Sequence, residues 1–385
     1  MLYRTFGKTG LSVSILGFGC MRLPLTDPKR PETIDEAASA RLLDIAIDNG
    51  VNYVDTAYPY HAAVPFTPGQ SELFVGKYLK GGKRDKVYLA TKLPSWSIQT
   101  REDCDRYLNE QLARLQTDHI DFYLVHCVMK QFWGNLKNAR VFEFLDAALK
   151  DGRIRYAGFS FHDELPLFRE VVDAYPWSFC QIQYNFMDEQ YQAGRAGLDY
   201  AAGKGLGVTI MEPLRGGNLT GNVPPAIQKI WDRADPRRSP AAWAFRHVWN
   251  HPGVSVVLSG MNQEAHLREN LKTAETGLPN SLSEQERGII EAVRKEYRAR
   301  IKVDCTSCKY CMPCPAGVNI PGCFSMLNNA AMFEDVGTAR FQYKAFIGEG
   351  RASKCVACGA CVAKCPQHIP IPERLKEVVA TIEAI

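Results

Sequence analysis

Eight short apolar runs recur along the first 260 residues, and this repeat constrains the fold more than any other feature of the chain. The runs are rich in β-branched and aromatic residues, as buried strands are. They span residues 14–19, 51–57, 87–92, 120–126, 154–160, 179–185, 207–213 and 254–260. Amphipathic helical patterns lie between several of them, at residues 36–50, 101–116, 139–152 and 263–274. Eight strands with crossover helices predict an α/β fold, a closed (β/α)8 TIM barrel rather than an open sheet.

The two ends of the chain differ from this repeat. Residues 3–14 resemble a hairpin ahead of the barrel, with glycine at its turn. At the other end, nine of the 13 cysteines crowd between Cys305 and Cys365. We therefore predict two domains: the barrel over residues 1–297 and a small, mainly α-helical iron-sulfur domain over residues 298–385.

Charge and composition exclude several classes of protein. Lys and Arg number 46 against 42 Asp and Glu, a formal net charge of +4, so nucleic acid is not an expected partner. No apolar run reaches the ~18 residues that span a bilayer, and the N-terminal segment lacks the apolar core and cleavage site of a signal peptide. We expect no membrane partner and a cytoplasmic location, where an odd number of cysteines does not predict disulfides.

Polar side chains stand where the predicted strands stop. In a closed barrel of parallel strands, the chemistry lies at the C-terminal ends of the strands. The residues at those ends are Asp55, Lys92, His126, Ser160, Gln181, Glu212 and Ser259. Any one of them alone is more often structural, but together they predict a functional site at this end of the barrel.

Three of these residues end successive strands, which lie about 4.8 Å apart, so Asp55, Lys92 and His126 can converge. Tyr60 follows Asp55 by five residues. A tyrosine hydroxyl has an ordinary pKa of about 10, and it needs a nearby positive charge to give its proton to a carbonyl oxygen. Lys92 can supply that charge if Asp55 keeps it protonated. His126 can then orient the substrate oxygen or share the proton.

The segment DTAxxY, the Lys of LATK, the His of YLVH and the segment GRIRYAGFS together resemble the aldo-keto reductases, over most of residues 1–297. The resemblance implies that Asp55, Tyr60, Lys92 and His126 form a catalytic tetrad. It also implies that hydride passes from NAD(P)H to an aldehyde or ketone, or back from the alcohol, with Tyr60 as general acid. The implied partner is a small-molecule carbonyl compound or alcohol.

The same resemblance assigns cofactor-binding positions. LGFGCM resembles the family's glycine turn beside the nicotinamide ribose. Ser160 and Gln181, at two strand ends, match the residues that hold the carboxamide. EPLRGG resembles the loop over the pyrophosphate. The segment SGMNQEAHLREN falls where the family binds adenosine. The implied positions are Gly19, Cys20, Met21, Asp55, Ser160, Gln181, Glu212, Leu214, Arg215, Gly216, Ser259, Gly260, Met261 and Asn270.

The choice between NADH and NADPH stays open at this stage. Family members that prefer the 2'-phosphorylated cofactor place Lys or Arg in the adenosine segment. This chain carries His266 where an arginine is common, and Arg268 lies on another face of the helix. Because a phosphate dianion favours bidentate arginine, NADH is slightly favoured.

One insertion bears on the substrate. After Tyr60 the chain runs HAAVPFTPGQSE, longer than the turn usual in the family. Its Val64, Pro65 and Phe66 form either an apolar lid over the site or an ordinary surface loop. Further candidates for the pocket lining are the aromatic residues Tyr58, Trp96 and Trp133.

Two cysteine runs indicate iron-sulfur clusters. Residues 355–366 reproduce the bacterial ferredoxin pattern C-x2-C-x2-C-x3-C-P, whose fourth thiolate ligates the other cluster, and residues 305–315 give C-x2-C-x2-C-x2-C-P. Zinc is the minority alternative, because a proline follows each fourth cysteine. The two predicted 4Fe-4S ligand sets are Cys305, Cys308, Cys311 with Cys365, and Cys355, Cys358, Cys361 with Cys314.

The whole arrangement resembles the ferredoxin-like extension on one branch of aldo-keto reductases. We expect the clusters to be structural or to link the enzyme to a ferredoxin or another electron carrier. Two alternatives remain. The clusters could be an obligatory electron-transfer path from a ferredoxin to the substrate. No flavin-binding pattern is visible in the sequence, however, and a flavin would be needed to couple one-electron and two-electron steps. The chain could also be a cofactor-sensing or redox-sensing regulatory protein.

Overall fold

The computed structural model describes residues 1–384, which form two compact units. The first unit comprises Met1–Gly216 and Ala241–Leu282. The second comprises Gly217–Pro240 and the chain from Ser283 onward. Within residues 1–384, no helix is long and apolar enough to cross a membrane.

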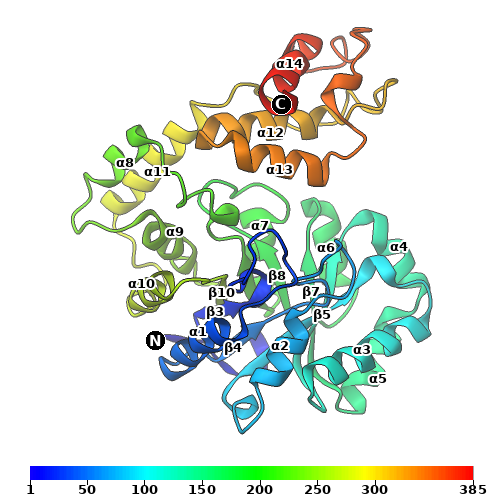
Figure 1. Cartoon of the computed structure of the whole chain (residues 1–385), viewed down its shortest axis with the longest axis vertical. Coiled ribbons are helices and arrows are strands. Elements are labelled where there is room, and N and C mark those ends of the chain that lie inside the picture. The colour runs from blue at the N-terminus through cyan, green and yellow to red at the C-terminus, as the bar shows by residue number, and fades with distance from the viewer. Residues whose placement is uncertain (385) are drawn as a thin grey trace. The chain divides into compact units, whose positions relative to one another are not determined.

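A closed barrel of eight parallel strands forms the centre of the first unit, in the order β10-β3-β4-β5-β6-β7-β8-β9 (Figure 1). The strands are β3 (Leu16–Gly19), β4 (Tyr53–Asp55), β5 (Tyr88–Pro94), β6 (Ile120–Val128), β7 (Ile154–Phe161), β8 (Phe179–Gln183), β9 (Gly207–Met211) and β10 (Val256–Ser259). Each of the eight predicted runs overlaps one of these strands, and β5, β6 and β7 extend one or two residues beyond their runs. The predicted (β/α)8 barrel is confirmed.

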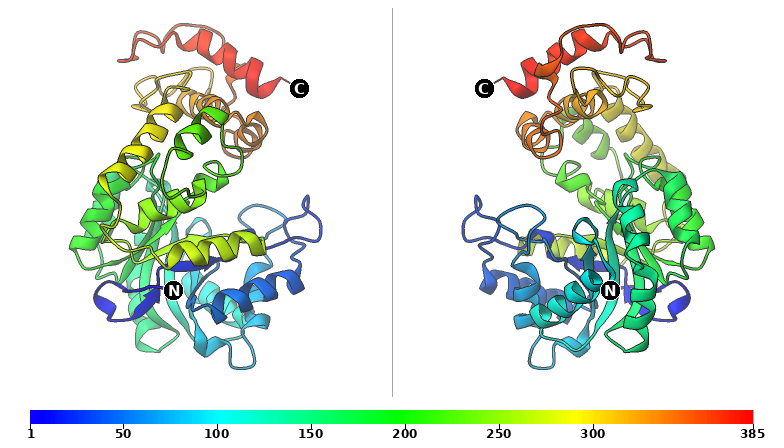
Figure 2. Two further views of the ribbon diagram at one scale, coloured as in Figure 1. Left: turned by 90° about the vertical axis from the view of Figure 1, so that its left-hand side faces the viewer. Right: turned by 90° about the vertical axis from the view of Figure 1, so that its right-hand side faces the viewer.

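Helices lie around the outside of this barrel (Figure 2), and their apolar faces pack against it. They are α1 (Glu36–Asp48), α2 (Ser71–Tyr78), α3 (Arg101–Leu115), α4 (Lys130–Asn138), α5 (Val141–Lys150), α6 (Leu165–Asp173), α7 (Gly194–Gly203), α9 (Pro240–Trp249) and α10 (Glu264–Ala274). In α1, for example, Leu42, Leu43 and Ala46 are buried at the spacing of one helical face.

The predicted hairpin closes one end of the barrel. Strands β1 (Tyr3–Thr5) and β2 (Ser12–Ser14) pair antiparallel, and Phe6 follows β1 into the barrel core. The Phe6 ring lies 4.6 Å from the Phe122 ring and 5.4 Å from the Phe179 ring, centroid to centroid. A side chain at Gly207 would come within 2.9 Å of the Phe6 ring. Since side chains fill this end, only the opposite end, where the strands stop, is open for chemistry.

Arg4 fastens the same hairpin to the rest of the unit. Its guanidinium donates to the carbonyl oxygens of Trp249 and Val254 at 2.6 Å, Gly277 at 2.9 Å and His251 at 3.2 Å. Burial lowers the pKa of Arg4 to about 10. One side chain therefore satisfies four carbonyl groups at the end of α9 and in the segments beyond it.

The second unit is helical, as predicted for the small domain. Its helices are α8 (Pro225–Trp231), α11 (Glu284–Arg298), α12 (Ile320–Phe333), α13 (Val336–Phe346) and α14 (Ile371–Val378). Helices α12, α13 and α14 surround a separate apolar core (Figures 1 and 2). Helix α11 packs on α8 and α12. Residues 217–240 and 283–297 therefore fall in this unit, although the sequence predicts both segments as part of the barrel domain.

Candidate functional site

Four polar side chains meet at the open end of the barrel. Asp55 ends β4, and Lys92 and His126 lie near the ends of β5 and β6. Tyr60 lies in the loop after β4. The parallel register pairs Asp55 of β4 with Ala90 of β5, and Pro94 of β5 with His126 of β6. These three adjacent strands therefore end at the same edge of the barrel. The barrel topology therefore gathers residues that lie up to about seventy positions apart in the sequence.

Lys92 is the centre of this group. Its side chain is fully buried, and its ammonium donates to Asp55 Oδ1 at 2.7 Å, to the Thr56 carbonyl oxygen at 2.8 Å and to the Tyr60 hydroxyl at 3.1 Å. An ammonium has three N–H donors, and three acceptors surround this one. The geometry fits a charged lysine held in one position.

The pKa values of Lys92 and Asp55 depend on their burial and on the attraction between their charges. Burial alone favours the neutral lysine, but the charge of Asp55 and the hydrogen bonds to Asp55 and Tyr60 hold the pKa of Lys92 above its usual value. Burial raises the pKa of Asp55, and Lys92 opposes that effect. Because Asp55 Oδ1 and Lys92 Nζ are only 2.7 Å apart, we infer that the ion pair is the stable state at neutral pH.

Tyr60 and His126 respond to the same surroundings. Burial raises the pKa of Tyr60, while the positive charge of Lys92 offsets part of that rise. Burial, and then the charge of Lys92, hold the pKa of His126 well below its usual range, so its imidazole is neutral at pH 7. Within residues 1–384, the buried Nδ1 atom of His126 has no hydrogen-bond partner. A neutral phenol and a neutral imidazole thus stand side by side, their rings 6.3 Å apart.

Two further residues stand close to His126. The ring of Trp96, one of the predicted lining residues, lies 5.2 Å from the His126 ring. His162, just beyond the end of β7, contributes to the low pKa of His126, and burial lowers its own pKa to about 4. His162 was not among the predicted site residues, although its place directly after a strand was a signal for it.

The other two predicted lining residues, Tyr58 and Trp133, are not in the pocket, and that expectation is wrong. The Tyr58 hydroxyl donates to Glu110 at 3.1 Å, and its ring packs against Tyr107 of α3. Trp133 Nε1 donates to Glu170 of α6 at 2.6 Å. Both side chains reach into the layer of helices, where their polar atoms find partners.

The glycine turn after β3 lies beside the tetrad. Gly19 pairs with Asp55 in the barrel register, and a Cβ atom at Gly19 would stand 3.4 Å from the carbonyl oxygen of Ser259. Cys20 is buried, whereas Met21 is 59% exposed. The backbone of this turn can therefore approach a ligand closely, with Met21 at its surface.

Ser160 and Gln181 lie opposite each other on β7 and β8. The Cys127 backbone N–H donates to Ser160 Oγ at 2.8 Å, which leaves the serine O–H as a donor. The buried Gln181 Oε1 atom has no partner within residues 1–384. A hydroxyl donor and an amide acceptor on neighbouring strands match the two polar atoms of a carboxamide, so these residues fit the nicotinamide group expected from the sequence.

The loop after β9 has an unusual backbone. Glu212, Arg215 and Gly216 all have left-handed conformations, with φ values of 53°, 51° and 69°. Arg215 Nε lies 3.0 Å from Asp188 Oδ2, and Leu214 packs against the barrel core. Left-handed non-glycine residues are costly and cluster at ligand-binding loops, which agrees with a binding role for this loop.

The segment after β10 joins that strand to α10. Asn270 of α10 donates to Ser259 Oγ at 3.2 Å, and both residues are buried, as is Met261. A Cβ atom at Gly260 would stand 3.1 Å from Cβ of Arg22. Ser259 and Asn270 therefore have a clear structural role in orienting the strand end toward the helix.

Glu264, the first residue of α10, places a negative charge in the segment that is predicted to bind adenosine. Its carboxylate pairs with Arg268 and with Arg41 of α1, each at 2.7 Å. The Arg268 hydrogen bond, followed by the charge of Arg41, lowers the pKa of Glu264. Both arginines are therefore engaged by a carboxylate at the helix start.

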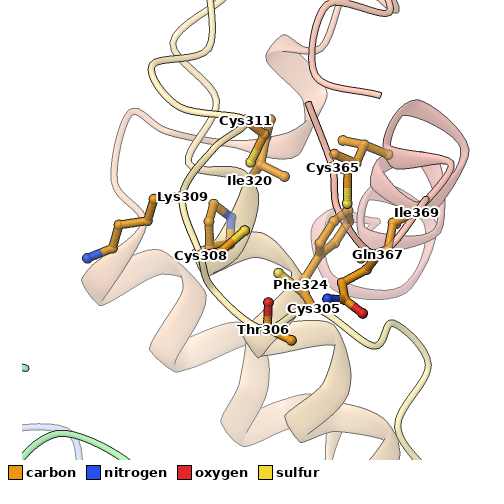
Figure 3. Close-up of a pocket in the computed structure, with 12 residues that line it drawn as sticks. Cys305, Thr306, Cys308, Lys309, Cys311, Ile320, Phe324, Cys365, Gln367 and Ile369 are labelled. Atoms are coloured by element: carbon orange, nitrogen blue, oxygen red, sulfur yellow. The ribbon is translucent and has the colours of Figure 1, made fainter. Parts of the chain in front are cut away.

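In the second unit, four of the predicted ligands line one pocket. Cys305, Cys308, Cys311 and Cys365 line this pocket together with apolar residues, and Figure 3 shows their sulfur atoms facing it. Phe324 contributes to an apolar wall. This set joins three cysteines of the first run to the last cysteine of the second, as the ferredoxin pattern requires.

The remaining cysteines form a neighbouring group. Burial raises the pKa of Cys361, and the charges of Cys355, Cys314 and Cys358 raise it further, so these four lie close together. No group of three or more His, Cys, Asp or Glu side chains in residues 1–384 is arranged to hold a single metal ion. Eight thiols in two crossed sets of four fit the donor chemistry of two clusters.

Comparison with protein families gives two matches. Residues 15–293 match the "Aldo/keto reductase family". Residues 304–369 match the "4Fe-4S dicluster domain".

Individual relatives match most of the chain. The protein "Protein tas" of Escherichia coli is 28% identical over 354 residues, covering 77% of this chain and 99% of that protein. L-galactose dehydrogenase of Arabidopsis thaliana is 28% identical over 303 residues, covering 70% of this chain and 86% of the relative. Among solved structures, the holo form of the aldo-keto reductase AKR11C1 from Bacillus halodurans shares the fold, with a TM-score of 0.62, 24% identity, and coverage of 76% and 96%.

Proposed function

Because the chain belongs to the aldo/keto reductase family, we propose that it is an NAD(P)H-dependent oxidoreductase that reduces an aldehyde or ketone, or oxidises the alcohol. The observation that carries this proposal is the position of the Lys92 ammonium, which donates both to Asp55 and to the Tyr60 hydroxyl. The name of one relative, L-galactose dehydrogenase, also describes chemistry between an alcohol and a carbonyl compound.

Tyr60 is the proton donor in this proposal. When bound, the nicotinamide cofactor supplies the hydride to the carbonyl carbon. The Tyr60 hydroxyl gives its proton to the carbonyl oxygen, and Lys92 stabilises the resulting phenolate. Asp55 balances the charge of Lys92 in the buried pocket, and the neutral His126 orients the oxygen through its ring N–H.

The residues proposed to hold the cofactor follow the strand ends around the barrel. Ser160 and Gln181 would hold the carboxamide, since Ser160 Oγ accepts a backbone hydrogen bond and can donate its own proton, and Gln181 Oε1 has no partner among residues 1–384. Gly19, Cys20 and Met21 would border the ribose. The loop from Glu212 to Gly216 would cover the pyrophosphate, and the segment from Ser259 to Asn270 the adenosine.

The second unit carries the dicluster domain, and we propose that it holds two 4Fe-4S clusters. The crossed cysteine sets described above would be their ligands. The clusters would be structural or would pass single electrons to and from a carrier protein. With four of these thiols around one pocket, the domain fold brings together cysteines that are up to 60 residues apart in the sequence.

The test of this function is hydride transfer itself. The protein is purified anaerobically and assayed with a panel of carbonyl compounds, using NADH and NADPH that carry deuterium at C4. We expect a product alcohol with deuterium on the former carbonyl carbon, detected by mass spectrometry. Tight binding of either nicotinamide with no deuterium transfer across the panel would contradict the proposal and favour the sensing role.

A further inference from the structure

A buried carboxylate lies behind the strand that carries Lys92. Successive side chains of a strand point to opposite faces, so Thr91 points outward to the helices while Lys92 points to the tetrad. Thr91 Oγ1 donates to Glu72 Oε1 at 2.7 Å and so joins strand β5 to helix α2. Both Thr91 and Glu72 are fully buried. The mechanism proposed above gives this carboxylate no role.

Gln111 of α3 connects the carboxylate to the backbone of Lys92. Its side-chain amide nitrogen donates to Glu72 Oε1 at 2.6 Å and to the Lys92 carbonyl oxygen at 3.1 Å. The Tyr123 hydroxyl donates to Gln111 Oε1 at 2.8 Å, so the amide cannot turn over without losing these bonds. The strand segment that bears the ammonium is therefore held at its main chain as well as at its side chain.

Arg114 extends the same cluster to the loop that carries Tyr60. Its Nε atom lies 2.9 Å from Glu72 Oε2, and its guanidinium also donates to the Gly69 carbonyl oxygen. A Cβ atom at Gly69 would lie 1.9 Å from the Tyr60 carbonyl oxygen, and Ser71 N–H donates to that oxygen at 3.2 Å. One buried carboxylate is thus connected, through different partners, to the backbone of the proton donor and of the lysine beside it.

The partners of Glu72 fit an ionised carboxylate. Thr91, Gln111 and Arg114 all donate to it. Burial raises the pKa of its carboxyl group, while the hydrogen bonds from Thr91 and Gln111, and then the charge of Arg114, oppose that rise. A buried ion pair is often no more stabilising than well-packed apolar residues, and one reason to keep such a pair is that it specifies a single geometry.

We propose that Glu72 and Gln111 are positioning residues for the reductase. They hold the backbones of Lys92 and Tyr60 so that the ammonium and the phenol oxygen stay 3.1 Å apart. They act from the helix-facing side of the barrel wall, and they affect the reaction only through these two residues. This inference rests on the proposed reductase function, so its test includes a measurement that requires no turnover.

The kinetic test removes each part of the link in turn. Gln111→Leu removes the amide that binds the Lys92 carbonyl oxygen and leaves the ion pair of Glu72 with Arg114 in place. Glu72→Leu removes the acceptor oxygens altogether. Because a misplacement of about 1 Å can cost about a hundredfold in rate, each variant should lower kcat for carbonyl reduction about ten- to hundredfold. The KM of the carbonyl compound and the Kd of the nicotinamide cofactor should change less than about threefold.

Glu72→Gln is the conservative variant. It keeps one oxygen that can accept from Thr91 and Gln111, although it removes the charge. If the carboxylate acts by holding its partners in place, this variant should retain at least about a third of the original kcat. An equal loss of kcat in Glu72→Gln and Glu72→Leu would overturn the positioning role.

Asp121→Asn is the matched control, because Asp121 is a second buried carboxylate of the barrel. It lies at the start of β6, away from the strand ends, where it pairs with Arg84 at 2.7 Å and accepts the Leu89 N–H at 2.9 Å. The control should lower stability but keep kcat within about twofold. A loss of kcat as large in the control as in Gln111→Leu, or no loss in Gln111→Leu, would overturn the proposal.

The measurement without turnover is a double-mutant cycle between Gln111→Leu and Lys92→Met. Unfolding of the full chain by guanidinium chloride is followed by tryptophan fluorescence, since five of the six tryptophans lie in the first unit. Substitutions within one hydrogen-bond network have non-additive effects, whereas distant, independent sites add. We expect the double variant to shift the midpoint less than the sum of the two single shifts, and Asp121→Asn to be additive with Lys92→Met.

The two tests separate the inference from the function on which it rests. Additive midpoint shifts for Gln111→Leu and Lys92→Met would overturn the positioning role, whether or not a carbonyl compound is reduced. A non-additive cycle in a protein that reduces no carbonyl compound would support the link to Lys92 and contradict only the reductase function.

Discussion

Lys92 Nζ lies 3.1 Å from the hydroxyl oxygen of Tyr60 and donates a hydrogen bond to it. A buried lysine can keep its proton only beside a negative partner, and Asp55 stands 2.7 Å away on the other side. The ammonium is therefore placed to stabilise a phenolate at Tyr60. This arrangement leads to specific expectations for pH dependence.

The pH profile should reflect the raised pKa of Tyr60. Carbonyl reduction needs the protonated phenol, and burial raises its pKa above the ordinary value of about 10. We therefore expect kcat for reduction to stay level through neutral pH and to fall only in strongly alkaline solution. His126 is already neutral, so no second change is expected near pH 6.5. Lys92→Met removes the charge that lowers the pKa of Tyr60, so it should move the alkaline fall to higher pH and reduce kcat about 10²–10⁴-fold.

The double variant Lys92→Met with Asp55→Asn is the control for this prediction, because it avoids leaving a buried carboxylate without its partner. Steady-state rates over pH 5 to 11, with circular dichroism to check folding, measure both variants. An alkaline fall in kcat that stays at the same pH without Lys92 would show that this lysine does not act on the titrating group.

Glu264 should decide between the two nicotinamide cofactors. Its carboxylate engages Arg41 and Arg268 and would repel a 2'-phosphate, so we expect kcat/KM to be higher with NADH. Glu264→Gln removes the negative charge and releases both arginines, which should raise kcat/KM for NADPH roughly tenfold and change the NADH value little. A strong NADPH preference in the unaltered enzyme would contradict this reasoning.

Arg4 should stabilise the barrel from the end opposite the active site. Arg4→Ala leaves four carbonyl groups without their donor, and we expect the free energy of unfolding to fall by about 2–4 kcal/mol. Chemical denaturation followed by circular dichroism measures it. Arg30→Ala, which removes an exposed arginine paired with Glu32, should change the free energy by less than about 0.5 kcal/mol. Equal effects of the two substitutions would contradict the role given to Arg4.

The crossed ligand sets predict the iron content of single cysteine variants. Cys314→Ser should disrupt the cluster that is completed by Cys355, Cys358 and Cys361 and should leave about four iron atoms per chain. Cys323→Ser is the control, since Cys323 is buried outside both runs and should leave about eight. Iron and acid-labile sulfide are measured after anaerobic purification. Full iron content in Cys314→Ser would exclude the crossed assignment.

Most of the fold could be predicted from local patterns in the sequence. The alternation of apolar runs and amphipathic helices predicted the barrel because its strands are short, buried and regularly connected. The tetrad residues were predictable in the same way, since the polar residue that ends a buried strand is easy to recognise, as at Asp55 and Lys92.

Features that depend on distant contacts were not predictable in this way. Arg4 binds carbonyl groups about 250 residues away, and no local pattern marks that contact. Trp133 and Trp96 both lie near strand ends, yet only Trp96 reaches the site, because Glu170 on α6 holds the other indole in the helical layer. The left-handed backbone conformation of Phe66 could not be predicted either, because phenylalanine rarely adopts it.

The most direct test of the whole account is the variant Tyr60→Phe, which removes one hydroxyl oxygen and leaves the ring and Lys92 in place. The rate of carbonyl reduction is measured together with the Kd of the nicotinamide cofactor, followed by its fluorescence. We predict that reduction falls at least 10³-fold while the Kd changes less than threefold. Turnover that persists at a tenth or more of the original rate would contradict the role of Tyr60 as proton donor.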